Sequence, residues 1–241
     1  MGYISMGCIG CSDGSVRRFD VMPDLKLVIF DVDGTLVDSQ AEIVAAMEIA
    51  FGAVNQPLPT RDTLLSVVGL SLVECFTILL PNCDASVRSM AVEAYKQGYH
   101  DNRVAGARPV LFDGMADLLD KLEQDDHILL GLATGKSRRG LDALLGFYGW
   151  ENRFVTTQVS DNHPSKPHPS MILTAMSETG VDAARTVMIG DTTYDIDMAR
   201  AAGVNAIGVD WGYHPKSALL HANAVVSRPD ALYSAIHTIL G

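Results

Sequence analysis

The chain has 241 residues, of which 48% are hydrophobic and 20% charged, and its formal net charge is −11. This composition suits a globular protein with one large core and a smaller second one. The acidity argues against a nucleic-acid partner, because phosphate backbones are bound by clustered Lys and Arg. No apolar run reaches the roughly 20 residues that cross a bilayer, so we expect no membrane association and a small-molecule partner.

The first 21 residues lack the charged start, apolar stretch and cleavage site of a secretory signal. We expect them to form a poorly ordered leader. The four cysteines (Cys8, Cys11, Cys75 and Cys83) form no metal-finger pattern and do not indicate disulfide dependence. A reducing, cytoplasmic compartment is therefore the expected location.

Short β-branched or aliphatic runs alternate with helical stretches along most of the chain, which predicts parallel strands joined by crossover helices. The runs are apolar throughout, as in a sheet covered by helices on both faces. The predicted fold class is therefore α/β, with a doubly wound parallel sheet. The expected strands are 25–30, 128–132, 154–157, 187–189, 205–209 and 224–226.

About a hundred residues separate the first two expected strands, far more than the ~10 to 15 of a crossover helix. Apolar spacing in this segment predicts helices almost throughout, interrupted at prolines. We therefore expect an inserted α-helical cap subdomain at 39–107 and a core domain made of 22–38 and 108–241. The expected cap helices are 41–51, 63–68, 72–80 and 85–99, and a further helix at 115–122 follows the return to the core.

Polar residues follow four of the expected strands, and in open parallel sheets ligands bind outside the carboxyl ends of the strands. We therefore expect these residues to meet at one edge of the sheet. In chain order they are Asp31 and Asp33, Thr134 and Gly135, Lys166, and Asp191 and Asp195.

Four carboxylates in one cleft would repel each other, and a bound cation would relieve that repulsion. Hard oxygen ligands suit Mg²⁺. A hydroxyl at Thr134 beside Gly135 could bind a phosphoryl oxygen, and Lys166 lies in a proline-restricted loop that can aim its ammonium. Taken singly, each motif also fits a structural role in a turn or a helix cap.

Together the four motifs resemble, in order, those of the haloacid-dehalogenase superfamily, specifically its phosphoglycolate-phosphatase-like group with a helical cap. The likeness runs from about residue 25 to the end of the chain. The segments that carry it are Asp31-Val-Asp-Gly-Thr-Leu-Val-Asp-Ser39, Leu132-Ala-Thr-Gly-Lys136, Lys166-Pro-His-Pro169 and Gly190-Asp-Thr-Thr-Tyr-Asp195 with the following residues to Gly203.

This resemblance implies a Mg²⁺-dependent phosphatase that acts on a small phosphorylated metabolite. Asp31 would form an aspartyl-phosphate, and Asp33 would act as general acid and then as general base. Thr134, Gly135 and Lys166 would bind the phosphoryl group. Mg²⁺ would be held by the Asp31 carboxylate, the Asp33 backbone carbonyl and Asp191, with Asp195 supporting the site directly or through water.

Other functions remain possible at this stage. Dehalogenation conflicts with an acid at Asp33, and phosphonoacetaldehyde cleavage needs an early cap lysine, whereas the cap has only Lys96. A sugar-phosphate mutase keeps all four motifs. An Asp-phosphorylated signalling module is another alternative, but it would be about half as long. A binding protein without catalytic activity is a further alternative, which turnover of any phosphate ester would exclude. The sequence leaves the identity of the ester and the oligomeric state open.

Several further polar residues favour structural roles. We expect His163 and His168 to be solvated, and Lys136, Arg138 and Arg139 to form a cationic start to the next helix. Trp211 and Tyr213 follow the fifth expected strand, where we expect core or edge packing.

Overall fold

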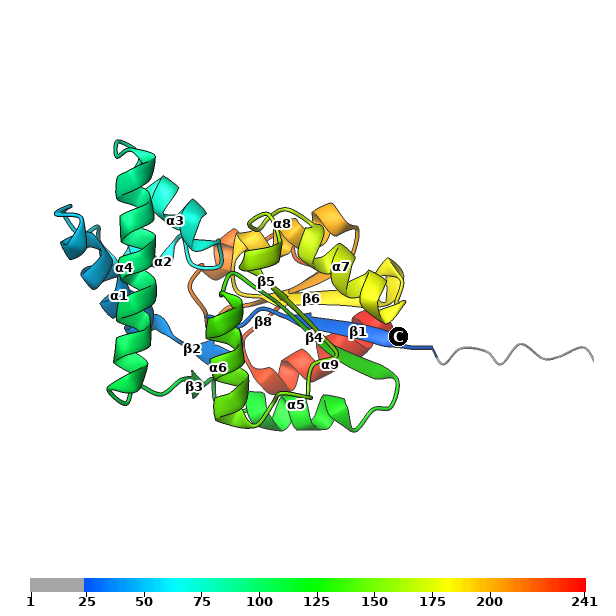
Figure 1. The fold of residues 1–241 in the computed structure, drawn as a ribbon. Helices are drawn as coiled ribbons and strands as arrows, with labels where there is room; N and C mark the ends of the chain where they lie inside the picture. The colour runs from blue at the N-terminus through cyan, green and yellow to red at the C-terminus, as the bar shows by residue number, and fades with distance from the viewer. Residues whose placement is uncertain (1–23) are drawn as a thin grey trace, which may run out of the picture.

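The computed structural model describes residues 24–241, so the predicted leader and its Cys8 and Cys11 lie outside the described residues. The described chain forms an α/β core with a helical subdomain beside one end of it (Figure 1). Between residues 24 and 241, no helix combines the length and apolar character that a membrane span requires.

The core is built on a six-stranded parallel sheet with strand order β5-β4-β1-β6-β7-β8. The chain builds the sheet outward from β1, first to one side and then to the other, which makes β1 the switch point. The strands are β1 (Lys26–Phe30), β4 (Ile128–Thr134), β5 (Thr156–Val159), β6 (Thr186–Gly190), β7 (Asn205–Val209) and β8 (Ala224–Val226).

Helices cover both faces of this sheet, which explains why its strands are apolar throughout. One hydrophobic cluster joins the sheet to α5 (Met115–Glu123), α6 (Arg138–Tyr148) and α9 (Pro229–Leu240). A second cluster joins the other face to α7 (Ser170–Thr179) and α8 (Thr193–Ala202). The predicted doubly wound sheet is confirmed.

Four helices inserted between β1 and β4 form the cap. Its members are α1 (Gln40–Ala53), α2 (Arg61–Leu65), α3 (Leu72–Leu79) and α4 (Ala85–Val104). They share a hydrophobic cluster of their own, in which Phe51, Phe76 and Tyr95 pack together. A short antiparallel pair, β2 (Val37–Asp38) with β3 (Val110–Leu111), joins the two chain crossings between cap and core.

Candidate active site

The predicted site residues lie at the carboxyl edge of the sheet. Asp31 directly follows β1, Thr134 ends β4 and Asp191 directly follows β6. Because β1 pairs with both β4 and β6, these three residues meet in the middle of the edge. All three are at most 1% exposed.

A tight turn after β1 brings Asp33 to the same place. The amides of Thr35, Leu36 and Val37 all donate to the Val32 carbonyl, which folds the chain back after Asp31. Gly34 has φ of 88°, and a Cβ there would lie 2.3 Å from Asp191 Oδ2, so only glycine fits this position. The turn therefore packs directly against the Asp191 carboxylate.

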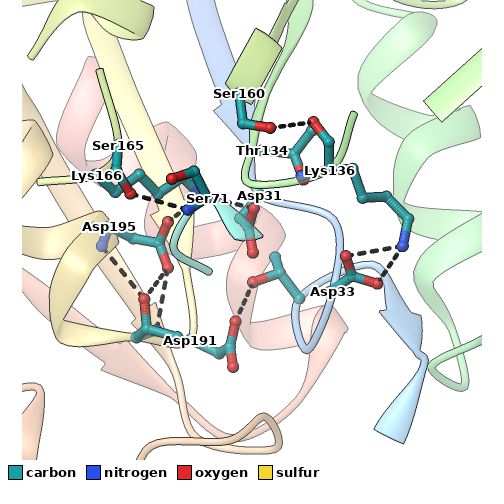
Figure 2. A network of polar contacts seen from close by, with 12 residues as sticks. Asp31, Asp33, Ser71, Thr134, Lys136, Ser160, Ser165, Lys166, Asp191 and Asp195 are labelled. Atoms are coloured by element: carbon teal, nitrogen blue, oxygen red, sulfur yellow. Dashed lines mark hydrogen bonds and ion pairs between the residues drawn. The ribbon is translucent and has the colours of Figure 1, made fainter. Parts of the chain in front are cut away.

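Lys166 joins two of the predicted carboxylates. Its ammonium donates to Asp31 Oδ1 and to Asp195 Oδ1, each at 2.7 Å (Figure 2). All three side chains are buried. Burial raises the pKa of Asp31 to about 7, with repulsion from Asp195 adding to the rise and Lys166 opposing it. Lys166 thus offsets part of the cost of burying these carboxylates.

Asp31, Asp191 and Asp195 form a cluster that could hold a cation. Each offers one carboxylate oxygen, and these oxygens lie within 4.8 Å of one another. Asp31 Oδ2 is buried and has no hydrogen-bond partner among the described residues. Burial, together with Asp195 and Asp31, raises the pKa of Asp191 well above its ordinary value. The oxygen-rich cluster and its orphaned atom fit a hard divalent cation such as Mg²⁺.

Local hydrogen bonds fix the two carboxylates that follow β6. Asp191 accepts from the Thr35 hydroxyl at 3.0 Å and from the Tyr213 amide at 2.8 Å. Asp195 caps α8 by a reciprocal pair of contacts with Thr192, so the capping role considered for it is real. The other carboxylate oxygen, Asp195 Oδ1, contacts Lys166. Asp195 can therefore cap α8 and belong to the carboxylate cluster at the same time.

Lys136 is a site residue that the sequence reasoning missed. Its ammonium contacts both oxygens of Asp33, at 2.7 and 2.8 Å, instead of forming part of a cationic helix start (Figure 2). The helix begins only at Arg138, after the cap residue Ser137. Ser39 also donates to Asp33. The only signal available in the sequence was the position of Lys136, two residues after Thr134.

The cap closes over this edge of the core. Its 66–71 segment contacts the core loops: the Ser71 amide donates to Ser165 Oγ at 2.9 Å, and Tyr194 donates to the Ser66 carbonyl at 3.0 Å. A Cβ on Gly135 would lie 2.6 Å from the carbonyl oxygens of Gly69 and Leu70. A cavity remains between cap and core, and Asp31, Asp33, Thr134, Gly135 and Lys136 line its floor.

The remaining polar predictions have mixed outcomes. His163 is not simply solvated: its ring nitrogens contact Gln158 at 2.9 Å and Ser170 at 2.8 Å, which ties down the loop that carries Lys166. His168 is exposed, as expected. Trp211 packs on Phe112 and donates to the Thr35 carbonyl, which confirms edge packing.

The family model for haloacid dehalogenase-like hydrolases matches residues 28–209 of the chain. The chain belongs to this family. The matched residues include most of β1, strands β4 to β7, the cap and all four motifs.

Named relatives agree with this placement. The chain is 37% identical over 220 residues to the "Probable phosphatase IndB" of Dickeya dadantii, covering 89% of this chain and 94% of that protein. It is 31% identical over 189 residues to a phosphoglycolate phosphatase of Xanthomonas campestris, covering 78% and 84%. A solved structure described as "a predicted phosphatase from Clostridium acetobutylicum" is similar with a TM-score of 0.79 at 26% identity, covering 89% of this chain and 99% of that one. The protein is therefore a phosphatase of this hydrolase family.

Proposed function

We propose that the protein is a Mg²⁺-dependent hydrolase of phosphate monoesters that works through an aspartyl-phosphate on Asp31. The observation that carries the proposal is the state of the Asp31 carboxylate. Its Oδ1 is held by Lys166, whereas its Oδ2 is buried at the cavity floor without a hydrogen-bond partner among the described residues. A carboxylate that is held in place through one oxygen, while the other oxygen has no hydrogen-bond donor, is suited to nucleophilic attack on phosphorus.

In the first step, an Asp31 oxygen forms a bond to phosphorus while the bond from phosphorus to the ester oxygen breaks. The departing alcohol takes its proton from Asp33. In the second step, Asp33 takes a proton from water as the water oxygen attacks phosphorus, the acyl-phosphate bond breaks, and phosphate leaves. Asp31 returns to a carboxylate, and the cycle consumes one water.

Other residues of the floor bind the phosphoryl group and position the acid. Thr134 and Gly135 lie at the end of β4, beside Asp31, and we assign them with Lys166 to the phosphoryl oxygens. Thr134 is 1% exposed, and its hydroxyl accepts from the Lys136 amide at 3.2 Å, which leaves its proton available to a ligand. The Lys136 ammonium fixes the Asp33 carboxylate from the other side.

We assign Mg²⁺ to the Asp31 carboxylate, Asp191 and the Asp33 backbone carbonyl, with Asp195 supporting the site. When bound, the cation neutralises charge on the phosphoryl oxygens. The hydrogen bonds to Asp191 from Thr35 and Tyr213 hold that carboxylate in place for this role. We also propose that the cap subdomain spans 39–107 and the core 22–38 with 108–241.

Phosphate release from p-nitrophenyl phosphate tests the proposal. We expect turnover with Mg²⁺, loss of turnover in a chelator, and inhibition by beryllium trifluoride with Mg²⁺, which mimics a phosphorylated aspartate. Excess Ca²⁺ should inhibit, because Ca²⁺ prefers more oxygen ligands at longer distances. Full activity in the chelator would contradict the metal assignment, and turnover unaffected by beryllium trifluoride would contradict covalent catalysis.

A further inference from the structure

The cavity between cap and core is much larger than a small phosphate ester requires. Its volume is about 980 Å³. A phosphate ester of a two-carbon acid has about nine non-hydrogen atoms, and at the roughly 30 Å³ that a water molecule takes in the liquid it would fill about 270 Å³. Sites for drug-sized organic molecules span about 300 to 1,000 Å³. The cavity therefore matches a substrate of that larger size.

Apolar side chains line this cavity from the cap side. Ile43 and Met47 come from α1, Tyr95 from α4, Leu72 from the start of α3, and Leu70 from the segment just before it. Four of these five side chains are buried, and Leu72 is half-buried. An apolar wall of this kind stabilises a ligand by removing apolar surface from water.

Two polar groups inside this wall are already engaged. The Cys75 thiol donates to the Val67 carbonyl at 3.1 Å. The Tyr99 hydroxyl accepts from the Lys136 ammonium at 3.2 Å, and its ring stacks on Tyr95 at 6.0 Å between centroids. Lys96 and Arg103 of α4 also line the cavity, but their side chains donate to Glu93 and to the Ala143 carbonyl, and His100 is exposed. Among the buried apolar side chains, a leaving group rich in hydroxyls would find few partners and would lose its hydrogen bonds to water.

We infer that the leaving group of the substrate has a bulky, apolar body of about the size of an aromatic ring, which the cap wall binds above the Asp31 floor. This inference rests on the proposed function. A substrate with this chemistry places its phosphoryl group at the polar floor and its organic body against α1, α3 and α4. Two-carbon acids and free sugars are therefore excluded as the preferred leaving groups.

Three phosphate esters of primary alcohols test the inference. Ethyl phosphate and 2-phenylethyl phosphate have leaving alcohols of similar acidity, so the chemical step is matched and only the apolar body differs. A hexose 6-phosphate has comparable bulk but is rich in hydroxyls. We expect kcat/KM for 2-phenylethyl phosphate to exceed both others by at least about tenfold, since even one buried methylene can supply 10-fold discrimination. Equal values, or a preference for the hexose ester, would overturn the inference.

Variants of the cap wall localise the effect. Leu72→Trp fills part of the cavity, and Leu72→Gln keeps its size but makes it polar. Both should reduce the preference for 2-phenylethyl over ethyl phosphate several-fold. The control is Val73→Gln on the same helix, because Val73 is 67% exposed and does not line the cavity. An unchanged preference in both folded Leu72 variants would contradict binding at this wall.

Calorimetric binding to the Asp31→Asn variant separates this inference from the proposed function. The variant should bind 2-phenylethyl phosphate at least about tenfold more tightly than ethyl phosphate. If the variant shows this binding preference but the parent protein turns over none of the esters, the apolar binding wall is supported and the proposed hydrolase function is contradicted. If the parent protein turns over all three esters with equal kcat/KM and the variant binds the two esters equally tightly, the proposed hydrolase function is supported and the apolar leaving-group inference is overturned.

Discussion

The floor and the roof of the cavity differ in chemistry and in origin. The floor and the carboxylate cluster that shares Asp31 with it are polar, buried and assembled from four loops that are far apart in the sequence. Asp31 meets Lys166 and Asp191 only because the sheet brings these loops together. The roof, formed by the cap, is apolar where it is buried and carries Lys96 and His100 where it is exposed. It comes from one continuous insertion with its own hydrophobic cluster. Under the proposed function, the core carries the chemistry and the cap selects the leaving group.

The largest expected effect comes from the floor. Asp31→Asn removes the proposed nucleophile and should lower kcat by at least about 10⁴-fold, as losses of nucleophiles do elsewhere. Steady-state phosphate release measures the loss. Asp126→Asn, at an exposed carboxylate outside the site, is the matched control and should retain parental activity. Substantial turnover by Asp31→Asn would place the chemistry elsewhere.

Asp33→Asn should behave differently from Asp31→Asn. It removes the proposed acid and base but keeps the backbone carbonyl assigned to Mg²⁺, so turnover should fall by roughly 10²- to 10⁴-fold while metal binding persists. With p-nitrophenyl phosphate, whose leaving group needs little acid, the deficit should move to hydrolysis of the phosphoenzyme. Single-turnover kinetics distinguish the two steps, and parental turnover by this variant would refute the role of Asp33.

Lys136→Met tests whether the contact between core and cap positions Asp33. The ammonium bridges Asp33 and the Tyr99 hydroxyl of α4, so its loss frees the carboxylate to move. Small misplacements of catalytic groups cost up to about 10²-fold, and we expect a fall in kcat of about 10- to 100-fold. Lys136→Arg should recover part of it. An unchanged kcat in Lys136→Met would limit Lys136 to a structural role.

Mg²⁺ should stabilise the core independently of catalysis. A Mg²⁺ concentration of about a hundred times the dissociation constant adds about 2.7 kcal/mol to the free energy of unfolding. For a chain of this size, that raises Tm by about 5 to 10 °C. Thermal unfolding with and without Mg²⁺ measures the shift. Asp191→Asn should lose most of it, whereas Asp126→Asn should keep it. An equal shift in both variants would argue against a cation at the cluster.

The smallest expected effect lies at the cavity mouth. Arg139 is exposed, lines the cavity and forms no ion pair with another residue of the 24–241 range. Arg139→Gln should lower kcat/KM a few-fold at low ionic strength, and the difference should shrink in salt, because an exposed charge acts by screened attraction of the anionic substrate. Arg228→Gln, outside the cavity, should show no such difference.

The sequence predicted the core more closely than the site, for physical reasons. Apolar runs bounded by polar residues located β7 and β8 to the residue, because a run of apolar residues leaves a strong local signal both in the buried β7 and in the half-buried edge strand β8. The strand expected at 154–157 lies instead at Thr156–Val159, since its polar residues Thr156 and Gln158 contact each other and Glu178 of α7. Local patterns do not reveal such long-range partners.

In the site, motif order predicted which loops converge, and the structure brings Asp31, Lys166, Asp191 and Asp195 together. It did not predict that Lys136 would contact Asp33, because the two residues are 103 positions apart in the sequence and the Lys136 ammonium also contacts Tyr99 in α4. The sequence also did not predict the cavity volume, because that volume depends on how the four cap helices pack above the sheet.

Trapping the intermediate tests the central claim most directly. The Asp33→Asn variant, mixed with p-nitrophenyl phosphate and Mg²⁺ and quenched in acid, should gain the mass of one phosphoryl group in the intact protein. Borohydride reduction followed by peptide sequencing should locate the modification at Asp31. A phosphoryl group on another residue, or product release with no modified protein at any time point, would contradict the proposed mechanism.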